Sequence, residues 1–300
     1  MSDQWQETRV FVRAADAGSF SAAARELGLS QPAVSRIITG LEARLGVKLL
    51  LRTTRSIALT EAGAAFLNRA RQAIADLEEA EQTARGIDSL KGTIRIAVAI
   101  VYGTKSLIPA LRSFLERHPD LRMDISVRDE RQDLIATGVD LAIRMGTLED
   151  STFGARAIAT VERMLVAAPS YIDGHGTPRD HDDLAHHLAI MHNGTSMARV
   201  SWQLSREGTT YSVNMHSRVR IDAAPGVFTA ALSGLGIANV TALMAREELA
   251  AGRLIRLLPD YCLEPLKAYA VFPSGPHPSA KVRALVDHLV AVLGPRAEGV

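Results

Sequence analysis

Four polar side chains in a short stretch near the N-terminus could hydrogen-bond to a nucleic acid. They are Gln31, Ser35, Arg36 and Thr39. Glutamine and arginine can make paired hydrogen bonds to a base edge, and the hydroxyl groups can bond to bases or phosphates. The same four residues also fit the solvated face of an ordinary amphipathic helix, and helical spacing alone favours that second interpretation.

Three helices are predicted to position these side chains. The second spans residues 20–27, and Gly28 permits a tight turn after it. Ser30 followed by Pro32 signals the start of a third helix, which runs to about Leu45. A helix, a short glycine turn and a second helix form a helix-turn-helix, whose second helix can enter a major groove. The residues expected to face inward from the first and third helices are Thr8, Phe11, Val12, Ala15, Val34, Ile38, Leu41 and Leu45.

A hairpin wing is predicted directly after the third helix. Two β-prone stretches flank a polar tip that consists of Arg52, Thr53, Thr54 and Arg55. Arginine and hydroxyl side chains at such a tip suit phosphate contacts and the negative potential of a narrow minor groove.

Five linked motifs in this region resemble the LysR-type transcriptional regulators. They lie, in order, at residues 18–27, 30–36, 41–46, 52–55 and 59–63. The resemblance implies a winged helix-turn-helix that binds a gapped, partly palindromic operator. Ile37, Gly40 and the pair Leu50-Leu51 differ from the common family pattern, so the base preference is not carried over.

The resemblance also implies roles for individual residues. The positions of Gln31, Pro32, Ser35 and Arg36 would face the major groove. Those of Ser21 and Thr39 would lie near the DNA backbone, and the arginines of the wing would reach the minor groove. The predicted DNA-binding residues are Ser21, Ser30, Gln31, Pro32, Ser35, Arg36, Thr39, Arg52, Thr53, Thr54 and Arg55.

A long helix over residues 61–90 is predicted to follow the head of residues 1–60. Apolar and small residues recur along it in steps of four and three, which is the seam of a coiled coil. The seam would either pair with a partner helix or lie on the chain's own domain. The family resemblance favours a homodimer, whose two-fold axis would match that of the operator. The predicted dimerisation residues are Phe66, Ala70, Ala73, Leu77, Ala80 and Ala84.

Residues 91–300 are predicted to form an α/β domain of two lobes. Short β-prone stretches alternate with helical ones from Thr93, which indicates a mostly parallel sheet. We expect residues 91–166 and 268–300 in lobe I and residues 167–267 in lobe II. Softer motifs at residues 139–146, 168–171, 234–237 and 251–254 extend the family resemblance and imply a periplasmic-binding-protein-like effector domain. The predicted fold class is therefore a winged helix-turn-helix with a long linker helix, followed by a two-lobed α/β effector domain.

A small molecule between the lobes is the expected ligand, because clefts at domain interfaces are favoured binding sites. Free N–H groups at helix starts attract anions, so we expect contacts just before a helix predicted at residues 105–117. Ile100 and Val101 make the entrance to the expected cleft apolar, which favours an effector with an apolar or aromatic body and one anionic end. Any single polar residue could instead be a helix cap or a turn residue. The predicted effector-binding residues are Val101, Tyr102, Gly103, Thr104, Arg144, His192, Asn193, Thr195, Pro225 and Gly226.

The overall charge of +1 conceals an uneven distribution. Residues 1–60 carry +3, residues 61–90 carry −3, and the remaining residues carry +1. The placement of arginines, and not the total charge, therefore supports a nucleic-acid partner.

Other classes of site find little support in the sequence. Cys262 is the single cysteine, which excludes a disulfide framework and fits a reducing cytoplasm. Five histidines lie between His175 and His192, but no His-Glu-x-x-His motif accompanies them. No apolar run approaches about 18 residues, and no secretory signal is visible at the start. We expect no catalytic residues, no metal, no cofactor, no membrane association and a cytoplasmic location.

The favoured interpretation is a transcriptional regulator that responds to an effector. Its expected partners are a double-stranded DNA operator, a small-molecule effector, RNA polymerase if it activates, and copies of itself in homodimers that assemble to homotetramers or larger. One alternative is an enzyme or solute-binding protein with an accessory head, which turnover or a bound cofactor would favour. Another is a constitutive DNA-binding protein whose large region only oligomerises, which effector-independent footprints would favour.

Overall fold

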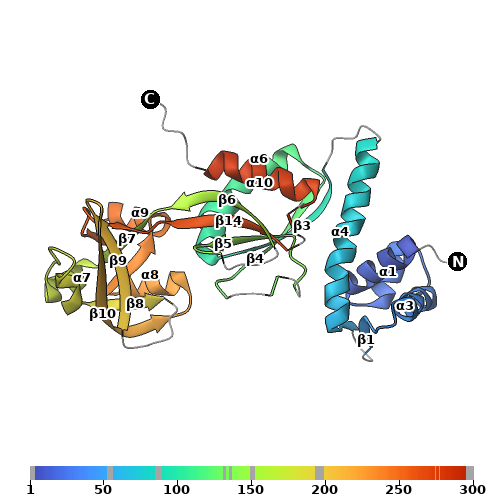
Figure 1. The fold of residues 1–300 in the computed structure, drawn as a ribbon, viewed down its shortest axis with the longest axis horizontal. Helices are drawn as coiled ribbons and strands as arrows, with labels where there is room; N and C mark the ends of the chain where they lie inside the picture. The colour runs from blue at the N-terminus through green and yellow to red at the C-terminus, as the bar shows by residue number, and fades with distance from the viewer. Residues whose placement is uncertain are drawn as a thin grey trace.

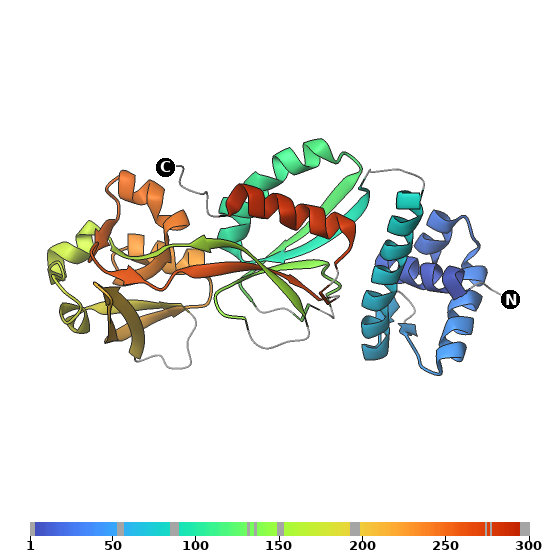
Figure 2. The ribbon, with the colours of Figure 1, turned by 45° about the horizontal axis from the view of Figure 1, so that its top comes forward.

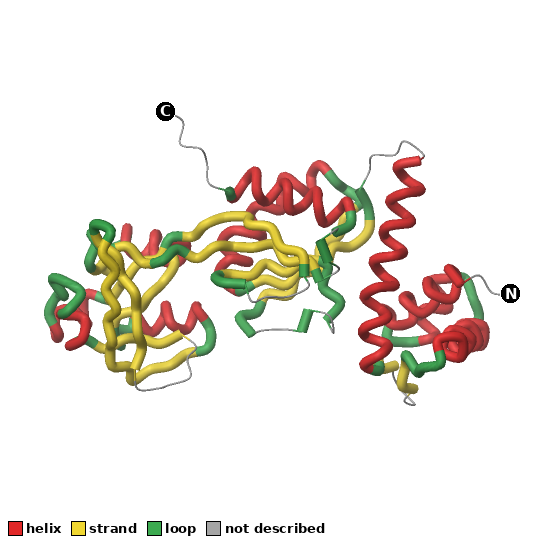
Figure 3. Tube along the Cα trace, in the orientation of Figure 1, coloured by secondary structure: helices red, strands yellow, loops and turns green. Residues whose placement is uncertain are grey.

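The chain folds into a small helical head, one long helix and a region of two lobes (Figure 1). Figure 3 shows the long helix standing between the head and the nearer lobe. The structure is a computed structural model that describes residues 4–52, 57–84, 90–130, 133–134, 137–148, 153–192, 199–273, 275–276 and 278–294.

The head is built from α1 (Gln4–Ala17), α2 (Phe20–Leu27) and α3 (Gln31–Leu45). A serine caps each of α2 and α3: Ser19 Oγ accepts a hydrogen bond from Ala22 N, and Ser30 Oγ, at the predicted helix start, accepts one from Ala33 N. Gly28 and Gly46 follow α2 and α3 with φ of 65° and 72°, which favours glycine. The core of the head includes Val10, Phe11, Ala14, Val34, Ile38 and Leu41.

A two-stranded hairpin completes the head and leads into the long helix. Strands β1 (Leu50–Arg52) and β2 (Ile57–Leu59) pair antiparallel. Helix α4 (Glu61–Ala84) follows, and at 1.5 Å per residue its 24 residues span about 36 Å.

Helix α4 lies with its first half against the head. Phe66 packs on Phe11 with ring centroids 5.3 Å apart, and Ala70 is buried in the core of the head. Phe66 and Ala70, two residues of the predicted dimer seam, are thus covered by the head of their own chain. They lie in the first turns of α4, directly after the wing, and this part of the helix packs on the head. Ala73 and Leu77 are exposed, and the side chains of Ala80 and Ala84 lie outside the described part of the chain.

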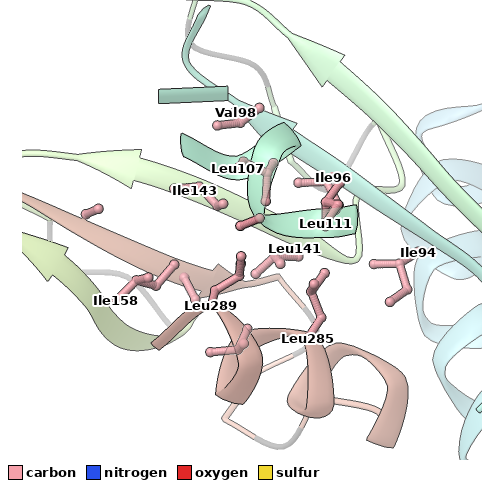
Figure 4. Close-up of a cluster of buried hydrophobic side chains, with 14 of the residues drawn as sticks. Ile94, Ile96, Val98, Leu107, Leu111, Leu141, Ile143, Ile158, Leu285 and Leu289 are labelled. Atoms are coloured by element: carbon pink, nitrogen blue, oxygen red, sulfur yellow. The ribbon is translucent and has the colours of Figure 1, made fainter. Parts of the chain in front are cut away.

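Lobe I contains a five-stranded sheet in the order β4-β3-β5-β14-β6. β3 pairs parallel with β4 and β5, and β14 pairs antiparallel with β5 and β6. Helices α6 (Ile108–Arg117) and α10 (Ala280–Leu293) pack on the sheet, and Figure 4 shows Leu111 near Ile96 and Leu285 near Leu141 in this core. The strands are β3 (Gly92–Val98), β4 (Leu121–Val127), β5 (Leu141–Met145), β6 (Gly154–Val161) and β14 (Leu266–Phe272).

The first helix of lobe I begins earlier than predicted. α5 (Ile100–Tyr102), the π-helical segment η1 (Gly103–Leu107) and α6 follow one another without a break. The prediction of a start at Lys105 is therefore wrong. The N–H of Ile100 donates a hydrogen bond to Asp129, which lies 29 residues further along the chain. Because this capping residue is distant in sequence, no local motif marks the start of the helix.

Lobe II contains a seven-stranded sheet in the order β12-β7-β11-β8-β10-β9-β13. Separate hydrophobic clusters form around this sheet, one including Trp202 and Tyr171 and another including Val227 and Ala245. The helices are α7 (Pro169–His175), the short 3-10 helix η2 (Asp183–His186), α8 (Ala224–Leu232) and α9 (Ala242–Ala250). The strands are β7 (Arg163–Ala167), β8 (Leu188–His192), β9 (Arg199–Arg206), β10 (Thr209–Ile221), β11 (Ile237–Thr241), β12 (Ile255–Leu257) and β13 (Cys262–Leu263).

Two crossings join the lobes, as the sequence predicted. The chain passes from β6 to β7 through Glu162 and returns from β13 to β14 through residues 264–265, a few residues before the predicted boundaries. Figure 2 shows these yellow-green and orange-red segments running side by side between the lobes. Among the described residues we find no helix with the length and apolar character that a membrane crossing requires.

Candidate functional site

The outer surface of α3 presents the predicted DNA-reading side chains. Gln31, Pro32, Arg36 and Thr39 are exposed, and Ser35 is half-buried. Ser30 accepts the hydrogen bond of Ala33 N and so fixes where α3 begins. Ser21 is exposed on α2. The helix therefore offers amide, guanidinium and hydroxyl groups on one exposed surface of a small head that is packed around its own hydrophobic core.

The two residues of α3 that differ from the family pattern have local explanations. Ile37 packs against the core of the head, which accounts for an apolar side chain there. Gly40 is exposed, and a Cβ added to it would meet only Glu7 Oε1, at 3.9 Å. The space around position 40 would therefore accommodate a side chain larger than that of glycine.

Buried Glu42 ties the start of the wing to α3. Its Oε1 accepts hydrogen bonds from Leu49 N at 3.0 Å and Leu50 N at 3.1 Å, and its Oε2 accepts one from Lys48 Nζ at 2.6 Å. Burial by itself raises the pKa of Glu42, but these hydrogen bonds and the Lys48 charge together hold it below its ordinary value. In the sequence, Glu42 is one member of a linked motif; its role as the anchor of the wing depends on contacts that only the structure shows.

The wing is also packed tightly against the start of α4. Thr60 Oγ1 donates to Lys48 O at 2.6 Å and accepts from Gly63 N at 2.9 Å, which caps α4. A Cβ added to Gly63 would lie 1.9 Å from the carbonyl oxygen of Leu49. Only glycine lets α4 come this close to the wing, which gives a physical reason for the Thr60–Gly63 motif.

The tip of the wing was predicted to contact DNA through four residues. Arg52 ends β1, but its side chain lies outside the described residues, as do Thr53, Thr54 and Arg55 entirely. Their contacts with DNA stay a prediction.

A charge cluster joins the head, α4 and lobe I. Asp16 of α1 pairs with Arg71 of α4, and its Oδ2 lies 3.5 Å from Arg95 Nη2 of β3. Asp140 Oδ2 accepts a hydrogen bond from Arg95 N at 2.7 Å, and burial raises the pKa of Asp140 despite this bond. The head is thus in direct polar contact with the sheet of lobe I.

A cavity of about 290 Å³ lies between the two lobes. We call it the interlobe cavity; α5 and the loop of Asp129 border it from lobe I, and β7, β8, β11 and the start of α8 border it from lobe II. Its walls include the apolar side chains of Trp202, Leu243 and Met244. A cavity of this size can hold a small organic molecule.

Two residues that line the interlobe cavity carry buried hydroxyl groups without hydrogen-bond partners. Tyr102 is 2% exposed, and neither its Oη nor Thr241 Oγ1 has a partner among the described residues. Burial raises the pKa of Tyr102 to about 12, so the phenol remains protonated and can donate. A buried polar group left unpaired costs about 1–3 kcal/mol, so both hydroxyls gain from a ligand that accepts hydrogen bonds.

Arg163 supplies a cation in the same cavity. Its Nε donates to Asn239 Oδ1 at 3.0 Å and its Nη1 to Glu264 O at 3.5 Å. Both acceptors are uncharged. Burial lowers the pKa of Arg163, and the nearby Glu264 carboxylate offsets only part of this effect. An anionic group in the cavity would relieve this cost.

The predicted effector residues are only partly brought together. Val101, Tyr102 and His192 line the interlobe cavity. Arg144, with His192, lines a second cavity of about 480 Å³ that is bordered mainly by lobe I. The structure places four others along neither cavity, and Asn193 and Thr195 lie outside the described residues; the four are Gly103, Thr104, Pro225 and Gly226.

These four residues miss the cavities for local reasons. Thr104 faces solvent and donates its hydroxyl to Ile100 O at 2.8 Å, inside the helix. Gly103 packs on Val98, and Gly226 packs on Ile221, with no room for a Cβ. Pro225 lies in the first turn of α8 and borders neither cavity. Because the helix begins at Ile100 and not at Lys105, the N–H groups of its first turn lie about five residues earlier in the chain than predicted.

Sequence reasoning missed the residues that give the interlobe cavity its chemistry. Arg163, Thr241 and Trp202 come from strands of lobe II, and Asp129 comes from a loop of lobe I. No local motif marks them. The one available signal was Arg163, a charged residue at the start of an otherwise apolar strand.

One described group could in principle hold a metal. Asp180, His181 and Asp182 offer ligand atoms within 4.8 Å of one another. His181 packs on Tyr211 with centroids 3.9 Å apart, and its Nδ1 lies 3.3 Å from Tyr261 Oη. Packing against tyrosines therefore accounts for this histidine, and exposed acidic groups are common without a metal.

Two protein families match the chain over most of its length. Residues 5–64 match the family described as "Bacterial regulatory helix-turn-helix protein, lysR family". Residues 88–294 match the family described as "LysR substrate binding domain". The chain is 35% identical over 297 residues to an HTH-type transcriptional regulator of Xanthomonas campestris, covering 98% of this chain and 86% of that protein. It is 32% identical over 298 residues to the regulator CrgA of Neisseria meningitidis, covering 98% of each.

Solved structures are similar over nearly the whole chain. The full-length virulence activator AphB of Vibrio cholerae, described as a member of the LTTR family, matches with a TM-score of 0.57 and 27% identity. That match covers 95% of this chain and 98% of AphB. CrgA of Neisseria meningitidis matches with a TM-score of 0.53 and 30% identity, covering 95% and 97%. ArgP of Mycobacterium tuberculosis, at 19% identity and a TM-score of 0.67, shares the fold.

Proposed function

The chain belongs to the LysR family of bacterial transcriptional regulators, with a DNA-binding helix-turn-helix and an effector-binding domain, and from this premise we propose how it works. A homodimer binds a two-fold symmetric operator through α3 and the wing, and a small organic anion in the interlobe cavity changes that binding. The observation that carries the proposal is the pair of unpartnered hydroxyls buried in the wall of a cavity between the lobes. The relatives are transcriptional regulators, and the enzyme alternative finds no support among them.

The chemistry of the interlobe cavity supports the class of effector. The hydroxyls of Tyr102 and Thr241 and the guanidinium of Arg163 are all hydrogen-bond donors, so they favour a ligand that presents acceptor oxygens. Trp202 and Met244 favour an apolar or aromatic body. A carboxylate with such a body satisfies both requirements.

The exposed part of α4 supports the homodimer. Leu77 is 40% exposed, and Ala73, one helical turn earlier, is exposed as well. A large apolar side chain beside a small one suits close packing of a second helix. Pairing there would place two heads on one operator, and such dimers would assemble further to homotetramers. Because chromosomal DNA is the proposed partner, the protein would act in the bacterial cytoplasm, and through RNA polymerase if it activates.

Operator binding can be tested by selecting DNA fragments with the full chain and measuring gel shifts over a salt series. Arg36→Ala should weaken binding to the selected fragment by about tenfold and reduce the dependence of affinity on salt. Arg112→Ala is the matched control, because Arg112 is an exposed arginine of lobe I paired with Glu116. Equal salt dependence for wild type and Arg36→Ala would contradict the assignment.

The effector site can be tested by calorimetry of the full chain with aromatic and aliphatic carboxylates and their neutral amides. A responding carboxylate should lose about tenfold or more in affinity with Arg163→Met, and its amide should bind weakly to both proteins. Thr104→Val is the control, because Thr104 is exposed and lines neither cavity. A ligand that loses affinity with Thr104→Val and keeps it with Arg163→Met would contradict the proposed cavity.

The dimer can be tested by sedimentation. Leu77→Glu should shift the full chain towards monomers, and Ala65→Glu, at an exposed position of the same helix, should not. A monomer–dimer equilibrium unchanged by Leu77→Glu would place the dimer contact elsewhere.

A further inference from the structure

One carboxylate group is bonded to both lobes at once. Asp129 follows β4 of lobe I and is half-buried. Its Oδ1 accepts a hydrogen bond from Ile100 N at 2.9 Å, and its Oδ2 accepts one from Ala224 N at 2.9 Å. Ile100 belongs to lobe I and Ala224 to lobe II, so the two oxygens of a single side chain span the cleft.

Both N–H groups lie at the starts of helices that lack a cap of their own. Ile100 begins the helical run that continues to Arg117, and Ala224 begins α8. The residues before them are Ala99 and Ala223, and neither provides a side-chain hydrogen bond. A helix start carries partial positive charge and unpaired N–H groups, so two such starts that face each other attract an anion. Asp129 is the anion that occupies this position.

The other described polar contact between the lobes in this region is different in kind. Lys105 Nζ lies 3.0 Å from Glu247 Oε1, but both side chains are largely exposed. Exposed pairs of this sort contribute little, because water and salt screen them. Asp129 is more buried and bonds to backbone groups that have no side-chain alternative. It is therefore the stronger of the two contacts.

We propose that Asp129 is a tethered anion that latches the two lobes together over the interlobe cavity. Opening the cleft requires its release from Ala224 N, while the bond to Ile100 N can remain within lobe I. An effector anion consequently does not bind at these two helix starts but at the donors Tyr102, Thr241 and Arg163. The two hydrogen bonds of Asp129 are sufficient for the latch itself. Its role in regulation also rests on the proposed function, in which the interlobe cavity binds an effector.

The latch can be tested in the full chain without effector or DNA. In Asp129→Ala, hydrogen–deuterium exchange should become about tenfold faster in peptides that contain Ile100 and Ala224. The melting temperature should fall by about 4–8 °C. Glu130→Ala is the matched control, because it removes the neighbouring exposed carboxylate, which bonds to neither helix start.

Chemical rescue tests whether the position is an anion site. About 0.1 M formate should restore the protection and the melting temperature of Asp129→Ala by mass action, and sodium chloride at equal ionic strength should not. The response of wild type, whose own carboxylate fills the position, is the baseline that includes any formate bound at the donors of the interlobe cavity, and Asp129→Ala should gain more than this baseline. Unchanged exchange at Ala224 in Asp129→Ala, or a failure of formate to restore it, would overturn the proposal.

A second variant covers the case in which Asp129→Ala does not fold. Asp129→Asn keeps the shape and one acceptor oxygen, so only one of the two N–H groups should stay protected. Protection of both at the wild-type level would overturn the latch. Since neither variant is measured with an effector, a failed search for a binding carboxylate leaves this result intact, and a failed latch leaves the cavity as a candidate site.

Discussion

The DNA-binding head and the regulatory domain assemble their sites in opposite ways. In the head, the candidate base-reading residues lie between Gln31 and Thr39 on one helix, and their placement follows from that helix and its cap. In the regulatory domain, Tyr102, Arg163 and Thr241 come from three distant segments that meet at the interlobe cavity. The head thus shows its chemistry in a short stretch of sequence, while the regulatory domain shows its chemistry only after folding.

The two regions also treat buried polar groups differently. Glu42 in the head has every acceptor engaged by nearby donors and holds the wing in place. Tyr102 and Thr241 in the regulatory domain are buried without partners. Buried polar groups that are fully hydrogen-bonded stabilise one fixed conformation. Buried polar groups without partners lower the stability of the fold, and a ligand that bonds to them removes this free-energy cost. The head is therefore a candidate reading surface with a fixed shape, and the interlobe cavity is a candidate binding site whose buried hydroxyls have no partner.

The largest expected effect tests whether the head is as rigid as this contrast requires. Gly63→Val places a side chain where a Cβ would lie 1.9 Å from Leu49 O, so the wing and α4 must move apart. We expect the head to lose about 3 kcal/mol of stability and operator affinity to fall about 100-fold. Denaturation followed by circular dichroism and gel shifts would measure both. Normal operator binding by Gly63→Val would show that the wing tolerates displacement.

A smaller loss is expected when the satisfied carboxylate of the head is neutralised. Glu42→Gln should lower the free energy of unfolding by about 1–3 kcal/mol at pH 7, because it loses the ion pair with Lys48 and weakens two backbone hydrogen bonds. Glu26→Gln, at an exposed position of α2, should change little.

The pH dependence of that loss follows from the lowered pKa of Glu42. The charged carboxylate contributes fully above its ordinary pKa near 4.5, and this contribution disappears as the pH falls through the lowered folded-state pKa. The difference between wild type and Glu42→Gln should therefore narrow in acid. A difference that stays constant from pH 7 down to about pH 3 would contradict the assigned ionisation.

The unsatisfied hydroxyl of the regulatory domain should give the opposite sign. Tyr102→Phe removes a buried hydroxyl that has no partner, so we expect the free energy of unfolding to rise by about 1 kcal/mol. Affinity for a responding carboxylate should fall at the same time. Thermal denaturation with and without ligand measures both effects.

The same substitution at a satisfied tyrosine is the matched control. Tyr171 Oη accepts a hydrogen bond from Leu188 N at 2.8 Å, so Tyr171→Phe should cost about 1–2 kcal/mol. If both substitutions destabilise the protein equally, the hydroxyl of Tyr102 has a partner in solution and the contrast between the two regions fails.

The smallest effect concerns the helix that carries the DNA-reading residues. Gly40→Ala adds a Cβ in ordinary contact with Glu7 Oε1 at 3.9 Å and removes a glycine from the interior of α3. It should stabilise the head by about 0.5–1 kcal/mol without changing operator affinity. Reduced affinity with unchanged stability would mean that DNA approaches position 40 closely. Because a Cβ fits at position 40 but not at position 63, Gly40→Ala is also the control for Gly63→Val.

Prediction from sequence succeeded where partners are near in the chain. The cap Ser30 acts three residues away, and the paired crossings between lobes follow from the alternation of strands and helices. It failed at the start of the first helix of lobe I. Ile100 and Val101 are β-branched and resemble the end of a strand, and the group that caps the helix is Asp129.

The sequence by itself determined the family, the winged helix-turn-helix, the candidate reading face of α3 and the two-lobed α/β plan, because each rests on local spacing, caps and linked motifs. Only the tertiary structure decided that Phe66 and Ala70, two of the six expected seam residues on α4, pack on their own head. It alone brought Tyr102, Arg163 and Thr241 to one cavity and placed Asp129 across the cleft. Those placements depend on contacts between residues tens to over a hundred positions apart, which periodicity and propensity do not encode.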